Sequence, residues 1–218
     1  MSLEKIEIET GPKPGAAVIW LHGLGADGRD FEPIVPELGL PASKPVRFVF
    51  PHAPIRPVTI NMGMRMRAWY DILQLGGGPE DEAGIRASQA LLEELISGEK
   101  KKGIPASKIV LAGFSQGGAI VLQTALRHPE PLGGVMALST YLPLGSRLKD
   151  EFSEKNQSLP IFMAHGDYDD MIPIARAQSS RAALEALGCK VEWHTYPMPH
   201  SVSPEEIGDM AEFLLRIL

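Results

Sequence analysis

The chain has 218 residues and a formal net charge of −6, with 44% hydrophobic and 22% charged residues. These proportions are typical of a globular protein with enough apolar side chains for a sizeable core. The acidic balance argues against nucleic acid as a partner, because phosphate binding needs a basic face and the lysines at 100–102 form the one concentrated basic run.

We expect neither an export signal nor a membrane-spanning segment. The first residues, MSLEKIEIET, lack the apolar region of a signal peptide, and no stretch approaches the ~18 apolar residues of a membrane span. The single cysteine, Cys189, cannot form an internal disulfide, so nothing points to an oxidising compartment. These features predict a cytoplasmic protein.

In chain order, short apolar runs that predict strands alternate with amphipathic runs that predict helices. The expected strands are residues 6–9, 16–22, 46–50, 108–114, 133–139, 159–166 and 190–197. The expected helices are residues 81–103, 116–129, 172–188 and 203–218. The run KIVLAGF at 108–114 is apolar throughout, which is typical of a central parallel strand covered on both faces. The alternation predicts one α/β domain over residues 1–218 with a mostly parallel sheet.

Two long stretches, residues 51–81 and 139–159, interrupt this alternation and are expected to be irregular. Long loops in compact domains are often functional, so these two are expected to wall a site above the strand ends. The last helix is well specified at its start, where Ser203 is expected to cap it, Pro204 fits the first helical position and Glu206 completes a capping box.

The segment Gly113-Phe114-Ser115-Gln116-Gly117 fits the pattern G-x-S-x-G and lies between an apolar strand and a helix. In that context the pattern indicates a nucleophile elbow, a strained turn that exposes the serine hydroxyl at the top of a sheet. A small residue that eases strand–helix packing is the structural alternative. We predict that Ser115 is a nucleophile.

A serine nucleophile needs a base, and the base needs an orienting acid. The segment HGDYDDMIP follows a later strand and offers Asp167, Asp169 and Asp170, which position alone does not separate. His194 and His200 are the histidines that follow these acids. His194 lies within a strand, where packing on the sheet is expected, whereas the loop position of His200 favours it as the base.

The oxyanion formed by acyl transfer needs two N–H donors. The amide of Gln116, directly after the serine, is the first candidate. The glycine-rich segment HGLGADG after an early strand supplies the second, and we favour the amide of Leu24. The alternative for that segment is a plain glycine-rich turn.

Four separated motifs, HGLGADG, GFSQGGA, HGDYDDMIP and MPHSVSPEE, occur here in one order. Together with MRAWYDI and LSTYLPL they closely resemble the phospholipase/carboxylesterase family of α/β-hydrolases over nearly the whole chain. The family includes bacterial carboxylesterases and acyl-protein thioesterases. The resemblance implies an α/β-hydrolase fold without a large cap domain.

Carried over residue by residue, the resemblance implies Ser115 as nucleophile, Asp169 as acid and His200 as base. Many relatives have proline after the acid, where this chain has Asp170. The family's acyl site also implies substrate contacts near Leu24, Ile72, Leu75, Tyr141 and Met171. Some relatives have tryptophan in place of Tyr141, which predicts an acyl channel of different shape.

The expected function is that of a serine carboxylesterase that hydrolyses a small-molecule or lipid ester through an acyl-enzyme. An acyl-protein thioesterase or lysophospholipase would use the same triad, so the triad does not separate these activities. A non-catalytic binding protein with this fold is disfavoured by the complete set of nucleophile, acid and base. This chemistry requires neither a metal nor another cofactor, and a homodimer remains a possible assembly.

Overall fold

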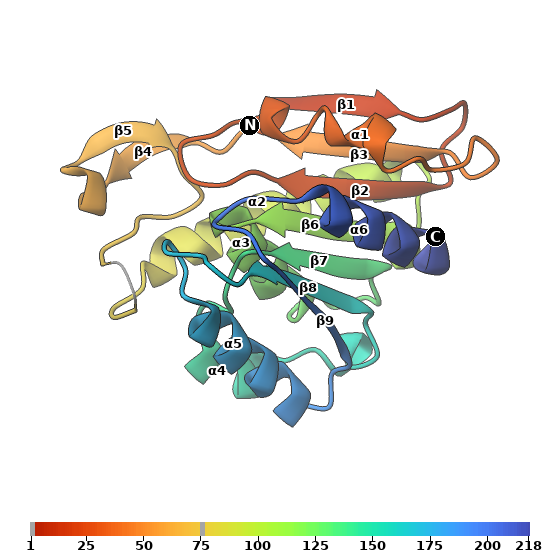
Figure 1. The fold of residues 1–218 in the computed structure, drawn as a ribbon. Helices are drawn as coiled ribbons and strands as arrows, with labels where there is room; N and C mark the ends of the chain where they lie inside the picture. The colour runs from red at the N-terminus through yellow and green to blue at the C-terminus, as the bar shows by residue number, and fades with distance from the viewer. Residues whose placement is uncertain (1–2, 75–76) are drawn as a thin grey trace.

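A mixed, mostly parallel sheet forms the middle layer of the molecule (Figure 1). The structure, a computed structural model, describes residues 3–74 and 77–218. The sheet of seven strands within that range has the order β1-β3-β2-β6-β7-β8-β9. Its strands are β1 (Lys5–Glu9), β2 (Ala16–Leu21), β3 (Val46–Pro51), β6 (Ile109–Phe114), β7 (Gly134–Leu138), β8 (Ile161–Gly166) and β9 (Val191–Tyr196). Strand β1 is antiparallel to β3, whereas the other neighbouring pairs are parallel.

Helices cover both faces of this sheet. They are α1 (Ile34–Glu37), α2 (Glu82–Lys101), α3 (Gln116–Ala125), α4 (Gly145–Glu151), α5 (Ile174–Ala186) and α6 (Pro204–Ile217). Short 3-10 turns are η1 (Gly28–Asp30), η2 (Thr59–Asn61), η3 (Ala106–Lys108) and η4 (Glu154–Asn156). Figure 1 shows α1 and α6 in front of the sheet and α2 and α3 behind it. The expected α/β-hydrolase architecture without a large cap is confirmed.

The alternation of side chains along the strands divides the core into two parts. In β2, Ala17, Ile19 and Leu21 pack with apolar residues of α2, α3 and α5, whereas Val18 and Trp20 pack with those of α1 and α6. All six residues of β2 are buried because both faces of a central parallel strand are covered by helices. Because β6, β7 and β8 pair in parallel, their carboxyl ends lie at one edge of the sheet, where ligands bind in open α/β sheets.

The two stretches expected to be irregular contain regular elements. Residues 51–81 include an antiparallel hairpin of β4 (Ile55–Val58) and β5 (Met64–Arg67), and α4 lies within residues 139–159. The hairpin is easily missed because Pro57 lies inside β4, and proline removes a ladder donor and is confined to edge strands. The connection passes through Met62, whose φ of 55° is left-handed. The expectation of purely irregular structure in these stretches was therefore wrong.

The start of the last helix follows the expected pattern in part. The Ser203 hydroxyl accepts a hydrogen bond from the Glu206 N–H at 3.2 Å, and Pro204 occupies the first turn. The reciprocal bond of a capping box is missing, because neither carboxylate oxygen of Glu206 has a hydrogen-bond partner among the described residues. The cap is confirmed, and the full capping box is not formed.

Candidate active site

Ser115 lies at the sharp turn between β6 and α3. Its backbone has φ 54° and ψ −119°, a conformation that costs a non-glycine residue about 1–3 kcal/mol. Hydrogen bonds hold it there: the Ser115 N–H donates to Leu138 O at 2.8 Å, and Thr140 Oγ1 donates to Ser115 O at 2.6 Å. The turn exposes the serine side chain at the carboxyl edge of the sheet, as expected for a nucleophile elbow.

Two glycines of the elbow have no room for a side chain. A Cβ on Gly113 would lie 2.5 Å from the carbonyl carbon of Gly117, and a Cβ on Gly117 would lie 2.4 Å from Leu21 O. Strand β6, helix α3 and the end of β2 therefore approach one another more closely than any other residue allows. The G-x-S-x-G spacing is thus a steric requirement of the turn.

Asp169 and His200 come together from two different loops at the same edge. His200 Nδ1 lies 2.7 Å from Asp169 Oδ2. The other carboxylate oxygen, Oδ1, accepts the N–H groups of Met171 and Ile172 at 3.0 and 2.8 Å. Because a carboxylate only accepts hydrogen bonds, Nδ1 of His200 carries the proton and Nε2 is left as an acceptor.

His165 contacts the loop that carries Asp169. Its Nε2 lies 2.8 Å from Ile172 O and 3.3 Å from Asp169 Oδ2. Burial lowers the pKa of His165, so its ring is neutral and acts as a hydrogen-bond donor rather than as a counter-charge. The ring therefore helps to orient the loop that carries Asp169.

The competing residues from the sequence have other environments. Asp167 and Asp170 are exposed, whereas Asp169 is buried against His200. His194 stacks on Phe162 with ring centroids 4.9 Å apart, and its Nε2 lies 3.1 Å from Glu192. It packs on one face of the sheet, as expected.

The loop after β2 brings Leu24 to the pocket that Ser115 also lines. His22 fixes this loop, because its Nδ1 lies 2.7 Å from Gly23 O while its Nε2 accepts the Ala53 N–H at 3.0 Å. Burial lowers the pKa of His22 to about 4, which keeps the ring neutral near pH 7. Among the described residues, no backbone carbonyl accepts the N–H of Leu24 or of Gln116. Both groups are therefore available to an oxyanion.

The Gln116 side chain links residues 69–70 to the turn at Ser115 by two hydrogen bonds. Its Oε1 accepts the Trp69 N–H at 2.7 Å, and its Nε2 donates to Tyr70 O at 2.8 Å. The Trp69 indole N–H also donates to His22 O at 2.9 Å. These contacts connect residues 69–70 with both candidate oxyanion loops, a role that sequence reasoning missed.

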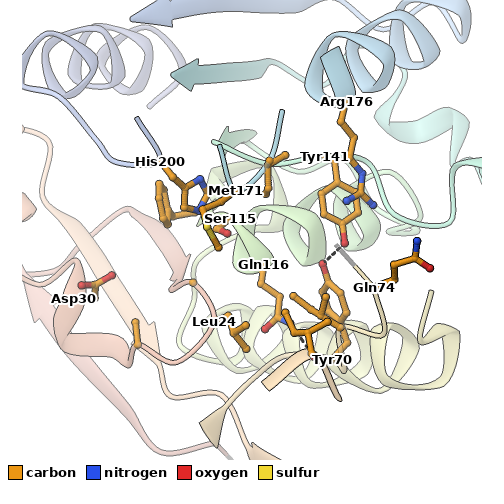
Figure 2. Close-up of a pocket in the computed structure, with 16 residues that line it drawn as sticks. Leu24, Asp30, Tyr70, Gln74, Ser115, Gln116, Tyr141, Met171, Arg176 and His200 are labelled. Carbon is orange, nitrogen blue, oxygen red and sulfur yellow. Dashed lines mark hydrogen bonds between the residues drawn. The ribbon is translucent and has the colours of Figure 1, made fainter. Parts of the chain in front are cut away.

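A pocket of about 290 Å³ opens above Ser115 (Figure 2). His200, Leu24 and Gln116 line it together with the serine. Of the expected substrate contacts, Ile72, Tyr141 and Met171 also line it, whereas Leu75 lies outside the described residues. Sequence reasoning missed further lining residues, including Asp30, Tyr70, Phe114 and Arg176. The sequence gives little indication of these residues, because they come from four separate segments and share no local motif.

Within residues 3–74 and 77–218, no group of three or more His, Cys, Asp or Glu side chains is arranged to hold a metal ion. The same range contains no helix with both the length and the apolar character needed to span a bilayer.

Comparison with known proteins identifies the family of the chain. The family model described as Phospholipase/Carboxylesterase matches residues 3–218. The chain belongs to the phospholipase/carboxylesterase family. As a member of this family the chain is a serine hydrolase.

Relatives in the phospholipase/carboxylesterase family are similar over almost their full length. Acyl-protein thioesterase 1 of Mycosarcoma maydis is 43% identical over 229 residues, covering 98% of this chain and 95% of the relative. The crystal structure of Arabidopsis thaliana SOBER1 has 32% identity and a TM-score of 0.87, covering 92% of this chain and 98% of that one. Zea mays acyl-protein thioesterase 2 has 29% identity and a TM-score of 0.85, covering 97% of this chain and 98% of that one.

Proposed function

We propose that this member of the phospholipase/carboxylesterase family hydrolyses carboxylic esters with Ser115, Asp169 and His200. The proposal rests mainly on one observation. The strained Ser115 lines the same pocket as His200, whose Nδ1 lies 2.7 Å from the buried Asp169. A nucleophile, a base and an orienting acid are the minimum set for acyl transfer through a serine.

The reaction proceeds in two steps. His200 Nε2 takes the hydroxyl proton as Ser115 Oγ attacks the ester carbonyl, and the Leu24 and Gln116 amides stabilise the oxyanion. The protonated imidazole then gives its proton to the leaving alcohol, and an acyl-enzyme remains. In the second step His200 takes a proton from water, which attacks the acyl-enzyme carbonyl, and the acid is released as the serine regains its proton. Asp169 holds the ring in the required tautomer and stabilises its charged form throughout.

Thioester hydrolysis is the second candidate, because relatives such as that of Mycosarcoma maydis are named acyl-protein thioesterases. The same triad cleaves both bonds, since only the leaving group differs. Parallel assays of a p-nitrophenyl ester, an acyl thioester and a lysophospholipid of equal acyl chain length separate these activities. A higher kcat/KM for the thioester assigns the thioesterase activity, and a higher value for a lysophospholipid assigns the lysophospholipase activity.

Labelling with a fluorophosphonate, followed by peptide mapping, tests the nucleophile. We expect the label on Ser115, and Ser115→Ala is expected to lose about 10⁶ in kcat, as when a triad acts as a unit. Ser179→Ala is the matched control, because this serine is exposed on α5 and its hydroxyl donates to Ala175 O. A folded parent that is neither labelled nor active would instead support a non-catalytic binding protein.

A further inference from the structure

Arg176 brings a positive charge to the wall of the pocket. It lies in the first turn of α5, is partly buried, and lines the pocket above Ser115. Its guanidinium carbon lies 3.3 Å from the centroid of the Tyr141 ring. Stacking of this kind fixes the planar guanidinium and leaves its N–H groups at the edge available to a ligand.

The guanidinium of Arg176 lacks an acidic partner. Among the described residues no carboxylate forms an ion pair with it, whereas Arg181 on the same helix pairs with Glu185 at 2.8 Å. The charge of Glu80 contributes to the raised pKa of Tyr70 and Tyr141, and its carboxylate accepts the Leu144 N–H at 2.9 Å. A partly buried arginine without a salt bridge, facing a reaction pocket, favours an anionic ligand.

Polar groups accompany Arg176 at this end of the pocket. The hydroxyls of Tyr70 and Tyr141 lie 2.7 Å apart, and burial raises the pKa of both phenols. Both hydroxyls therefore keep their protons. The hydrogen bond between them uses one O–H as donor, so the other O–H is free to donate to a ligand. The Gln74 side chain also lines this end, whereas Ile60, Ile72 and Met171 line the pocket with apolar groups.

The positions of Arg176 and His200 around Ser115 decide which part of a substrate reaches Arg176. Figure 2 shows His200 on one side of Ser115 and Arg176 on the other. His200 must face the leaving group to protonate it. The acyl chain therefore extends away from His200, past the apolar residues and toward the polar end.

We propose that Arg176 selects acyl chains that end in a carboxylate, so that half-esters or half-thioesters of dicarboxylic acids are preferred over neutral acyl chains. The apolar residues contact the methylene chain, and the guanidinium with the free tyrosine O–H binds the terminal anion. This inference rests on the proposed hydrolysis at Ser115 and assigns a substrate class to the same site.

The test compares p-nitrophenyl half-esters of adipic, pimelic and suberic acid with the corresponding terminal amides, which have the same shape without the charge. The parent is expected to prefer at least one carboxylate over its amide. Arg176→Met is expected to lower that preference about tenfold or more, the effect of losing hydrogen bonds to a charged group. Arg176→Lys keeps the charge without the planar fork and is expected to lie in between.

Two further arms sharpen the result. Arg181→Met removes an arginine from the same helix outside the pocket and is expected to leave the ratio unchanged. Arg176→Glu is expected to favour an acyl chain ending in an ammonium group. Because the readout is a ratio of two substrates on one sample, a general loss of activity does not mimic it.

The inference is overturned if the parent does not distinguish the carboxylate from the amide, or if Arg176→Met leaves the ratio intact. It is also overturned if Arg176→Met changes only the preference for a charged leaving group, tested with a carboxyphenyl ester of a neutral acid. In each of these cases the esters are still hydrolysed and Ser115 is still labelled by a fluorophosphonate. Failure of the proposed function itself would instead abolish labelling and turnover of every ester.

Discussion

Two buried carboxyl groups in this molecule have opposite surroundings. Asp169, in the loop after β8, is 7% exposed, and Glu206, in the first turn of α6, is 0% exposed. Asp169 accepts hydrogen bonds from the Met171 and Ile172 N–H groups and from His200 Nδ1. The carboxyl oxygens of Glu206 have no partner within residues 3–74 and 77–218.

The difference shows that burial alone does not make a carboxylate useful for catalysis. Burial raises the pKa of Glu206 to about 8, and the charge of Asp209 adds to this rise. Glu206 is therefore held as a neutral acid near pH 7. Asp169, in contrast, is surrounded by N–H donors, which are the groups that a carboxylate needs when it orients an imidazole.

Of the changes at these two carboxyl groups, the largest effect is expected when Asp169 no longer accepts a hydrogen bond from His200. Asp169→Asn keeps the shape but presents an amide N–H to His200 Nδ1, which favours the wrong tautomer and is expected to lower kcat about 10⁴-fold. The measurement is steady-state hydrolysis of a p-nitrophenyl ester. Asp167→Asn, at an exposed neighbour, is the control and should keep the parent rate. A kcat for Asp169→Asn within tenfold of the parent would remove Asp169 from the mechanism.

A large effect on stability is expected at the other carboxyl group. The folded state keeps the Glu206 proton up to about pH 8, whereas the unfolded chain loses it near the usual value of 4.5. The contribution of the protonated Glu206 side chain to the free energy of unfolding is therefore complete below about pH 4.5. This contribution is lost as the pH rises toward 8, by at most about 1.4 kcal/mol per pH unit.

Glu206→Gln tests this linkage, because glutamine cannot ionise. Urea unfolding of the parent and the variant is expected to give similar free energies near the acidic end of this range. At about pH 8 the variant is expected to be more stable by several kcal/mol, the sum of that slope over the interval. Ester hydrolysis is the control and should persist. Parallel stability profiles for the two proteins would contradict a buried, titrating Glu206.

The smallest effect separates the helix cap from the carboxyl group. Ser203→Ala removes the acceptor of the Glu206 N–H and is expected to lower the free energy of unfolding by about 1 kcal/mol. Loss of a neutral cap is independent of pH, so the profile should shift down without a change of slope. If the slope changed as in Glu206→Gln, the hydroxyl and the carboxyl group would act as one unit.

The sequence by itself determined the features that depend on neighbours along the chain. The apolar runs predicted the strands, because a strand covered on both faces has apolar side chains in succession. The G-x-S-x-G pattern predicted the turn at Ser115, because the close approaches at Gly113 and Gly117 exclude any Cβ. The helix cap at Ser203 is equally local. The resemblance of the motifs to a known family added the choice of Asp169.

Only the tertiary structure decided how distant segments meet. Residue patterns left Asp167, Asp169 and Asp170 equivalent, and the folded loop buries one of them against His200, 31 positions further along the chain. The meeting of Arg176 with Tyr141 and Tyr70 depends in the same way on separate loops and a helix. Such contacts depend on the position of each loop at the edge of the sheet. A local sequence pattern contains no information about residues that only packing brings together.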